Sequence, residues 1–183
     1  MILMVILLNN GDEMTKMMIY IFFILVFSAF AYTYTCQEGR FTIDLPEEGS
    51  VSLEQDYLKV WIKKSATYED FGIGWGNVND EYMKDYCGGS FDIKKFHDFI
   101  VNLYINDGFT VTSETYLSSS EAIMMGVETG FILKLDDERQ QRFGFYAFFV
   151  KHELCYRFYG ERGKTPKYRD VIIKTLNSFH AFD

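Results

Sequence analysis

Three cysteines, Cys36, Cys87 and Cys155, are the side chains of this chain best suited to covalent chemistry. Two thiols can oxidise to a disulfide in an exported protein, and three cysteines allow three pairings. Cys36 and Cys87 are predicted to lie in irregular segments beside ordered elements. We therefore expect the disulfide between these two, while the sequence leaves the other pairings open. Cys155 lies in an apolar run typical of a central strand, which predicts a buried, unreactive thiol.

Histidines and serines form no recognisable catalytic or metal-binding pattern. His97 falls in a predicted helix, where a metal pair needs a second ligand four residues later, and Val101 occupies that position. We expect His97 on the solvated face, His152 in a turn and His180 in the last helical turn. No histidine accompanies residues 118–120, so this serine run is predicted to be a loop. The sequence thus predicts neither a metal nor a cofactor.

Glycines alternate with large apolar residues from Phe71 to Gly76. No helix follows at the spacing of a phosphate-binding loop, so that function is disfavoured. The bare glycine face of a strand is expected to let an aromatic ring, such as that of Tyr57 or Trp61, lie flat across it. A second interpretation is an exposed groove that receives a ligand or peptide. Its candidate rim residues are Trp75, Asn77 and Asn79.

Periodicity predicts the elements that position these residues. Ser90 is expected to cap a helix that ends at residues 106–108, and residues 165–166 are expected to start a second helix. Predicted strands cover residues 41–45, two segments of 50–64 on either side of residues 55–56, and residues 71–75, 110–116, 123–135, 142–150 and 154–159. This order gives an α+β fold, an antiparallel β-sheet with helices packed on it.

The N-terminal segment is organised like a secretory signal peptide. A cation, Lys16, precedes an apolar run that closes with small residues at Ala29 and Ala31, which predicts cleavage after Ala31. From residue 17 to residue 31 a helix would span roughly 22 Å, short of the roughly 30 Å hydrocarbon core, which disfavours the alternative of a retained anchor. A lipoprotein, with Cys36 as the lipidated residue, is a weaker alternative. Residues 1–13 resemble a mis-annotated extension, with translation starting at Met14.

Composition predicts one acidic domain over residues 32–183. The chain has 26 acidic and 18 basic residues, a formal net charge of -8, and no internal repeat or linker is evident. No basic run exceeds two residues, so nucleic acid and anionic lipid are disfavoured as partners. We expect membrane contact only through an uncleaved N-terminal segment.

Four features together resemble the PsbP-like superfamily. They are the phrase Phe41-Thr-Ile-Asp-Leu-Pro46, a mid-chain helix ending at Gly108, a long hairpin over residues 143–159 and the closing phrase at 171–179. That superfamily includes the extrinsic photosystem II protein, the bacterial envelope protein DcrB and a Ran-binding nucleotide-release factor. The resemblance implies an αβα sandwich and an accessory or binding role, but no functional residue can be transferred.

These observations predict an exported, non-enzymatic accessory or binding protein, secreted or periplasmic. We expect a protein partner to bind at the sheet face or at the edge of residues 72–79. The alternative is a small secreted hydrolase, with Glu69, Asp70, Asp80 and Glu81 gathered by the fold. A concave pocket with two or more convergent ionisable groups would favour the enzyme, and an aromatic patch over a filled core would favour the binding protein.

Overall fold

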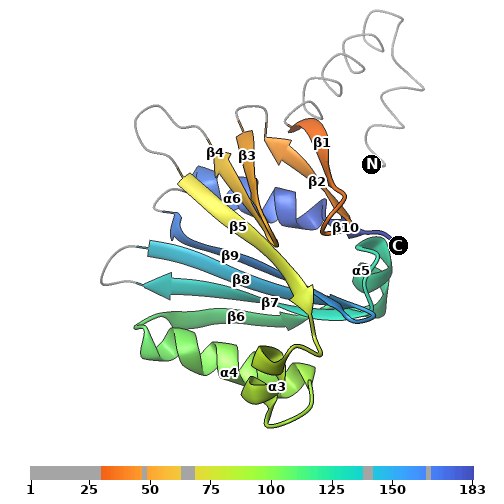
Figure 1. The fold of residues 1–183 in the computed structure, drawn as a ribbon. Helices are drawn as coiled ribbons and strands as arrows, with labels where there is room; N and C mark the ends of the chain where they lie inside the picture. Colours follow the sequence, from red (N-terminus) through yellow and green to blue (C-terminus); the bar gives the residue numbers. More distant parts are fainter. Residues whose placement is uncertain (1–29, 47–48, 63–68, 138–141, 164–165) are drawn as a thin grey trace, which may run out of the picture.

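The computed structural model describes residues 30–46, 49–62, 69–137, 142–163 and 166–183 (Figure 1). Four helices and ten strands lie within these ranges, and none of these helices is long and apolar enough to cross a membrane. The helices are α3 (Glu81–Cys87), α4 (Ile93–Asn106), α5 (Ser119–Met124) and α6 (Pro166–Asn177). The strands are β1 (Phe30–Cys36), β2 (Phe41–Pro46), β3 (Gly49–Glu54), β4 (Tyr57–Ile62), β5 (Glu69–Asn77), β6 (Thr110–Tyr116), β7 (Thr129–Asp137), β8 (Arg142–Lys151), β9 (Leu154–Gly163) and β10 (His180–Ala181).

A seven-stranded antiparallel sheet forms the centre of the fold, in the order β3-β4-β5-β9-β8-β7-β6. Within each half, strands that follow one another in the chain lie side by side, and α5 lies in the connection from β6 to β7. The pairing of β5 with β9 connects the two halves and opposes Gly74 to Arg157. A second, smaller sheet has the order β1-β2-β10.

Alternation along the strands divides the interior into two cores on opposite faces of the large sheet. On β8, Phe145, Ala147 and Phe149 lie in the first core, whereas Tyr146 and Phe148 lie in the second. Helices α5 and α6 and the small sheet cover the first core, and α3 and α4 cover the second (Figure 1). The predicted α+β class and helix-sheet-helix layering are confirmed.

Cover on the second face is incomplete. Helix α4 contacts β6 and β7, and α3 packs on α4, so both helices lie at one end of the sheet (Figure 1). At the other end, the second-face side chains of β4 and β9 are half-buried or exposed. They are those of Tyr57, Lys59 and Trp61 on β4, and of Arg157 and Tyr159 on β9. We call this region the open half-face, and it positions the candidate site.

Most predicted elements are present, but several boundaries differ. Residues 119–124 form α5, in place of the predicted loop and early strand, because Ser118 and Glu121 make a capping box. Asp92, not Ser90, caps α4. His180 lies in β10, after the last helix has ended at Asn177. Helix α3 and strand β1 had no counterpart in the predicted elements.

Candidate functional site

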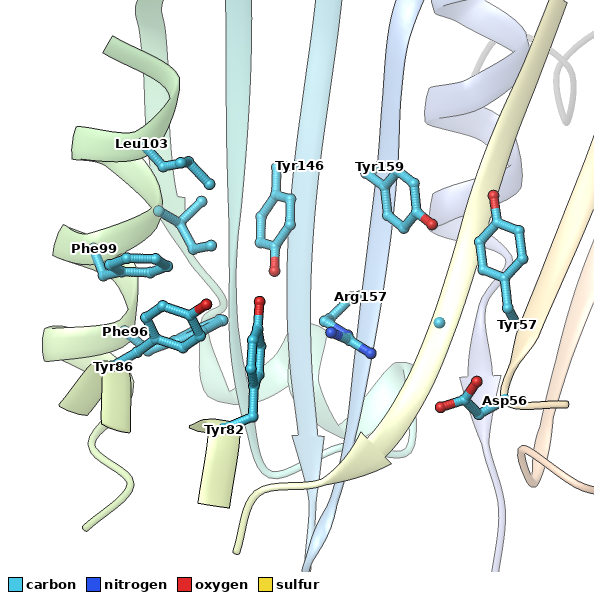
Figure 2. Close-up of a pocket in the computed structure, with 12 residues that line it drawn as sticks. Asp56, Tyr57, Tyr82, Tyr86, Phe96, Phe99, Leu103, Tyr146, Arg157 and Tyr159 are labelled. Atoms are coloured by element: carbon cyan, nitrogen blue, oxygen red, sulfur yellow. The ribbon is translucent and has the colours of Figure 1, made fainter. Parts of the chain in front are cut away.

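A cavity of about 550 Å³ lies where α3 and α4 meet the open half-face (Figure 2). Helix α4 forms one wall, β8 and β9 form the floor, and the turn between β3 and β4 forms the opposite rim. Most of the lining is aromatic, so a ligand would lose much of its contact with water. The lining residues are Asp56, Tyr57, Gly74, Tyr82, Tyr86, Phe96, Phe99, Ile100, Leu103, Tyr146, Arg157 and Tyr159.

The glycines of β5 make room for side chains from both neighbouring strands. The ring of Tyr57 lies over Gly72, where an added Cβ would overlap its phenol. The guanidinium of Arg157 lies over Gly74, where a Cβ would stand 3.5 Å from Nη2 and 3.6 Å from Nε. The prediction that an aromatic ring crosses this bare strand is therefore confirmed for Tyr57. The ring of Tyr57 also stacks on that of Tyr159, with the centroids 5.7 Å apart.

Arg157 is the cation of this cavity, and it is incompletely paired. Its Nε atom is buried and has no hydrogen-bond partner. Among the described residues, no carboxylate forms an ion pair with its guanidinium. Figure 2 shows Arg157 between the hydroxyls of Tyr82 and Tyr146 on one side and Asp56 on the other. A desolvated donor without an acceptor is unfavourable, so the side chain is suited to receive an acceptor from outside.

Tyrosine hydroxyls add neutral donors around the guanidinium. Burial raises the pKa of Tyr146 well above its usual range, and the positive charge of Arg157 opposes this only in part. A hydrogen bond with Tyr82 is the largest cause that raises the pKa of Tyr86. Both phenols stay protonated at neutral pH and can donate hydrogen bonds.

Comparison with solved structures identifies the fold. The solution structure of cyanobacterial PsbP from Synechocystis sp. PCC 6803 superimposes with a TM-score of 0.57 at 9% sequence identity, over 84% of this chain and 94% of that one. The chain has the PsbP-like fold. At this identity the likeness concerns the fold alone.

A crystal structure of a protein from Bacteroides thetaiotaomicron VPI-5482 matches less well. Its TM-score is 0.41 at 10% identity, over 82% of this chain and 48% of that one. No protein-family model matches the chain, and no curated protein matches its sequence. The PsbP-like fold therefore rests on the cyanobacterial structure and on the topology described above.

In this PsbP-like fold the predicted ligand rim does not form. The side chain of Trp75 lies in the first core, where its ring packs edge-on against that of Phe41. It is buried because odd-numbered positions of β5 face the first core, whereas the cavity lies on the glycine face. Asn79 is exposed in the turn after β5, and its N–H donates to Asn77 Oδ1 at 2.7 Å. Asn77 lines a different cavity, together with Lys151 and Asp183.

The predicted Cys36–Cys87 disulfide is absent from the structure, where all three cysteines are free thiols. Cys36 lies in the first core and Cys87 in the second, so the large sheet separates them. Cys155 is buried in β9 as predicted, and burial raises its pKa to about 11. Burial also raises the pKa of Cys36.

His97 is buried, which corrects the expectation of a solvated residue. Its ring lies between those of Tyr116 and Phe131, with centroids 5.1 and 4.9 Å away. Its Nδ1 lies 3.1 Å from Asp98 Oδ1, and its Nε2 lies 3.3 Å from Glu114 Oε2. His152 is exposed in the turn between β8 and β9, as predicted. No group of three or more potential metal ligands occurs within the described ranges.

The carboxylates of the hydrolase alternative are not gathered at one place. Asp70 lies at the start of β5 and pairs with Lys59 Nζ at 2.7 Å. Asp80 lies beyond the end of β5, where its Oδ2 accepts from the N–H of Asn77 at 3.3 Å, and Glu81 begins α3. The strand alone separates the two ends by roughly 23 Å. The side chain of Glu69 is outside the described part, as are Ala29 and the side chain of Ala31 at the predicted cleavage site.

Sequence reasoning missed Arg157, Tyr82 and Tyr86. Arg157 is a single cation in an otherwise aromatic strand, from Tyr156 to Tyr159, and that isolation was the available signal. Tyr82 and Tyr86 are four residues apart, which places them on one face of a helix. Their rings pack edge-on at 4.5 Å, and Tyr86 continues onto Phe99 at 3.9 Å.

Proposed function

We propose that this protein is an exported, non-enzymatic binding protein of the cell envelope that receives a protein partner on the open half-face. The observation that carries this proposal is the cavity around Arg157, whose aromatic lining continues onto the exposed part of the sheet. Concave sites lined by rings with a few polar groups are typical of binding sites.

The composition of the open half-face supports a protein partner. Tyr, Trp and Arg are the residues that contribute most often to binding hot spots. Tyr57 and Trp61 on β4, with Arg157 and Tyr159 on β9, supply all three residue types on the two strands that flank β5. Lys59 Nζ lies 4.0 Å from the centroid of the Trp61 ring and so orders the outer end of this surface.

The chemistry of the lining favours binding over hydrolysis. General acid–base catalysis needs a group that exchanges its proton near the working pH. The raised pKa values of Tyr86 and Tyr146 keep those phenols protonated at neutral pH. Asp56 is the one carboxyl group among the described residues that line the cavity, and it lies exposed on the rim. Export is inferred from the signal-peptide organisation of residues 16–31.

Site-specific photo-cross-linking in the native host tests this function. A benzophenone amino acid replaces Leu103, an exposed residue at the cavity, or Ile123, an exposed residue on α5 at the first face. We expect an envelope protein to be cross-linked from position 103 and not from position 123. The purified partner should then bind the wild type and lose affinity for Trp61→Ala. Equal capture from both positions, or unchanged affinity of Trp61→Ala, would contradict the proposed surface.

A further inference from the structure

We propose that the cavity recognises an oxyanion, a carboxylate or its phosphate equivalent, carried on an aromatic group, and that Arg157 binds the oxyanion. This inference rests on the proposed function and names the chemical group that the open half-face recognises. It goes beyond that function because a partner could also bind through the aromatic surface alone.

The position of the guanidinium is the first argument. Gly74 lets it lie flat against β5, with a Cβ position 3.5 Å from Nη2, 3.6 Å from Nε and 3.8 Å from Cζ. One face of the planar guanidinium is therefore held against the strand, while the side chain lines the cavity. A planar fork presented in this way matches the two oxygens of a carboxylate or phosphate.

Unsatisfied hydrogen-bonding capacity is the second argument. The buried Nε of Arg157 has no acceptor, and no described carboxylate pairs with the guanidinium. Asp56 lies across the cavity at the rim, without an ion pair to Arg157 (Figure 2). The phenols of Tyr82 and Tyr146 face the same space as hydrogen-bond donors (Figure 2). An external oxyanion would satisfy the guanidinium and these donors together.

The charge of Arg157 disfavours cationic ligands. The chain is acidic overall, with a net charge of -8, yet the charge at the floor of this cavity is positive. A cationic group would be repelled by Arg157, and Asp56, the carboxyl group among the described lining residues, lies exposed on the rim. An oxyanion is the complementary ligand.

The aromatic walls of the cavity favour an aromatic group next to the oxyanion of the ligand. On one side Tyr86 and Phe99 present rings in contact, with centroids 3.9 Å apart, and Leu103 extends this wall. On the other side Tyr57 and Tyr159 stack with their planes 19° apart. An aromatic ring carried beside the oxyanion would pack against either surface, since offset-stacked and edge-on ring pairs are both favourable.

A matched series of small ligands tests the inference. Indole-3-acetate carries the carboxylate, indole-3-acetamide replaces it with a neutral amide, and tryptamine reverses the charge. We expect the acid to bind about tenfold or more tightly than the amide, and tryptamine to bind most weakly. Calorimetry gives the affinities, and amide chemical shifts should change on β5, β9 and α4. Comparing the affinities for phenyl phosphate and phenylacetate identifies the preferred oxyanion.

Variants of the protein tie the preference to Arg157. Arg157→Gln should abolish the tenfold preference for the acid, and Arg157→Lys should retain part of it, because it keeps the charge and loses the fork. Gly74→Val keeps the arginine but fills the space beneath the guanidinium. It should therefore lower the affinity for indole-3-acetate and leave the affinity for indole-3-acetamide unchanged. Lys94→Gln removes an exposed cation on the outer side of α4 and should behave like the wild type.

Equal binding of acid and amide by the wild type, or an acid preference that survives in Arg157→Gln, would overturn the inference. If the acid series fails while position 103 still cross-links the partner, the inference falls and the proposed function stands. If position 103 captures no partner while the wild type still prefers the acid, the proposed protein partner is contradicted and the oxyanion inference stands. If indole-3-acetate competes with the partner and prevents its cross-linking, the natural oxyanion belongs to that partner. If the partner still cross-links in the presence of indole-3-acetate, the natural ligand is a free aromatic acid.

Discussion

Gly72 and Gly74 lie two residues apart on the same face of β5, yet an added side chain would meet different neighbours at each. At Gly72 it would overlap the phenol of Tyr57, whereas at Gly74 the nearest atom would be at an ordinary contact distance. Gly72 is therefore required by the geometry of the Tyr57 ring, whereas at Gly74 a small side chain would fit and would suit a strand better than glycine.

We predict that Gly72→Ala lowers the free energy of unfolding by about 1–2 kcal/mol, because the displaced Tyr57 ring loses its stack on Tyr159. Gly74→Ala should stay within about 0.5 kcal/mol of the wild type, since its methyl group fits and the strand gains a better β-former. Urea unfolding of the two variants measures both values. Equal destabilisation would show that the Tyr57 ring does not require Gly72.

The thiols provide a second prediction at the residue scale. Cys36, Cys87 and Cys155 are almost fully buried, and the pKa values of Cys36 and Cys155 are raised, so little reactive thiolate is present. We expect Ellman's reagent to label the folded protein slowly, and to titrate three thiols after unfolding without a reductant. One thiol after unfolding would instead indicate a disulfide and revive the pairing predicted from the sequence.

Helix α4 is capped by Asp92, whereas the sequence pattern predicted Ser90 as the cap. Asp92 Oδ1 accepts from the N–H groups of Lys94 at 2.9 Å and Lys95 at 3.0 Å, whereas Ser90 lies two residues earlier and is exposed. Because α4 carries Phe99, Ile100 and Leu103 to the cavity, its first turn helps to hold the ring wall in place.

We predict that Asp92→Ala lowers the urea midpoint and that Ser90→Ala does not. The backbone N–H of Lys95, followed by that of Lys94, lowers the pKa of Asp92 below its ordinary value of about 4. The capping contribution is thus present above that ordinary value and is lost as the pH falls through the lowered pKa. The unfolding curves of the wild type and Asp92→Ala should differ at neutral pH and converge at acidic pH. An equal midpoint at neutral pH would contradict the cap.

At the scale of elements, periodicity predicted the elements that bury a regular stripe. The alternation in β5 and the stripe of α4 follow from burial on one face, so both could be located. Helix α3 was missed because a seven-residue helix is stabilised mainly by packing, here of Met83 and Cys87, and not by propensity. The site depended on that helix, which supplies Tyr82 and Tyr86.

The position of Arg157 could not be derived from local pattern at all. Its placement over Gly74 requires that β9 pairs with β5 in one register, and these strands are about 80 residues apart in sequence. A shift of one residue would turn Arg157 into the first core. Long-range register is fixed by the packing of the whole sheet, so the sequence predicted the bare glycine face but not the cation that lies on it.

At the scale of the molecule, the sheet order explains why the proposed binding surface lies on one half of the second face. Helices α3 and α4 cover the end of the second face near β6 and β7, and the first face is covered by α5, α6 and the small sheet (Figure 1). The N-terminal hairpin of β1 and β2 belongs to that first-face cover. The predicted cleavage site after Ala31 lies inside β1.

Cleavage after Ala31 would remove the paired position Phe30↔Pro46 and keep every β1–β2 pair from Tyr32↔Leu45 to Cys36↔Phe41. The exported protein should therefore retain the small sheet and begin at Tyr32, which intact mass and N-terminal sequencing of the extracytoplasmic fraction would show. Ala31→Lys should block processing, because the peptidase requires a small residue there, whereas Ala31→Ser should be processed normally. A protein recovered with residues 17–31 still attached would contradict the signal peptide and favour an anchor.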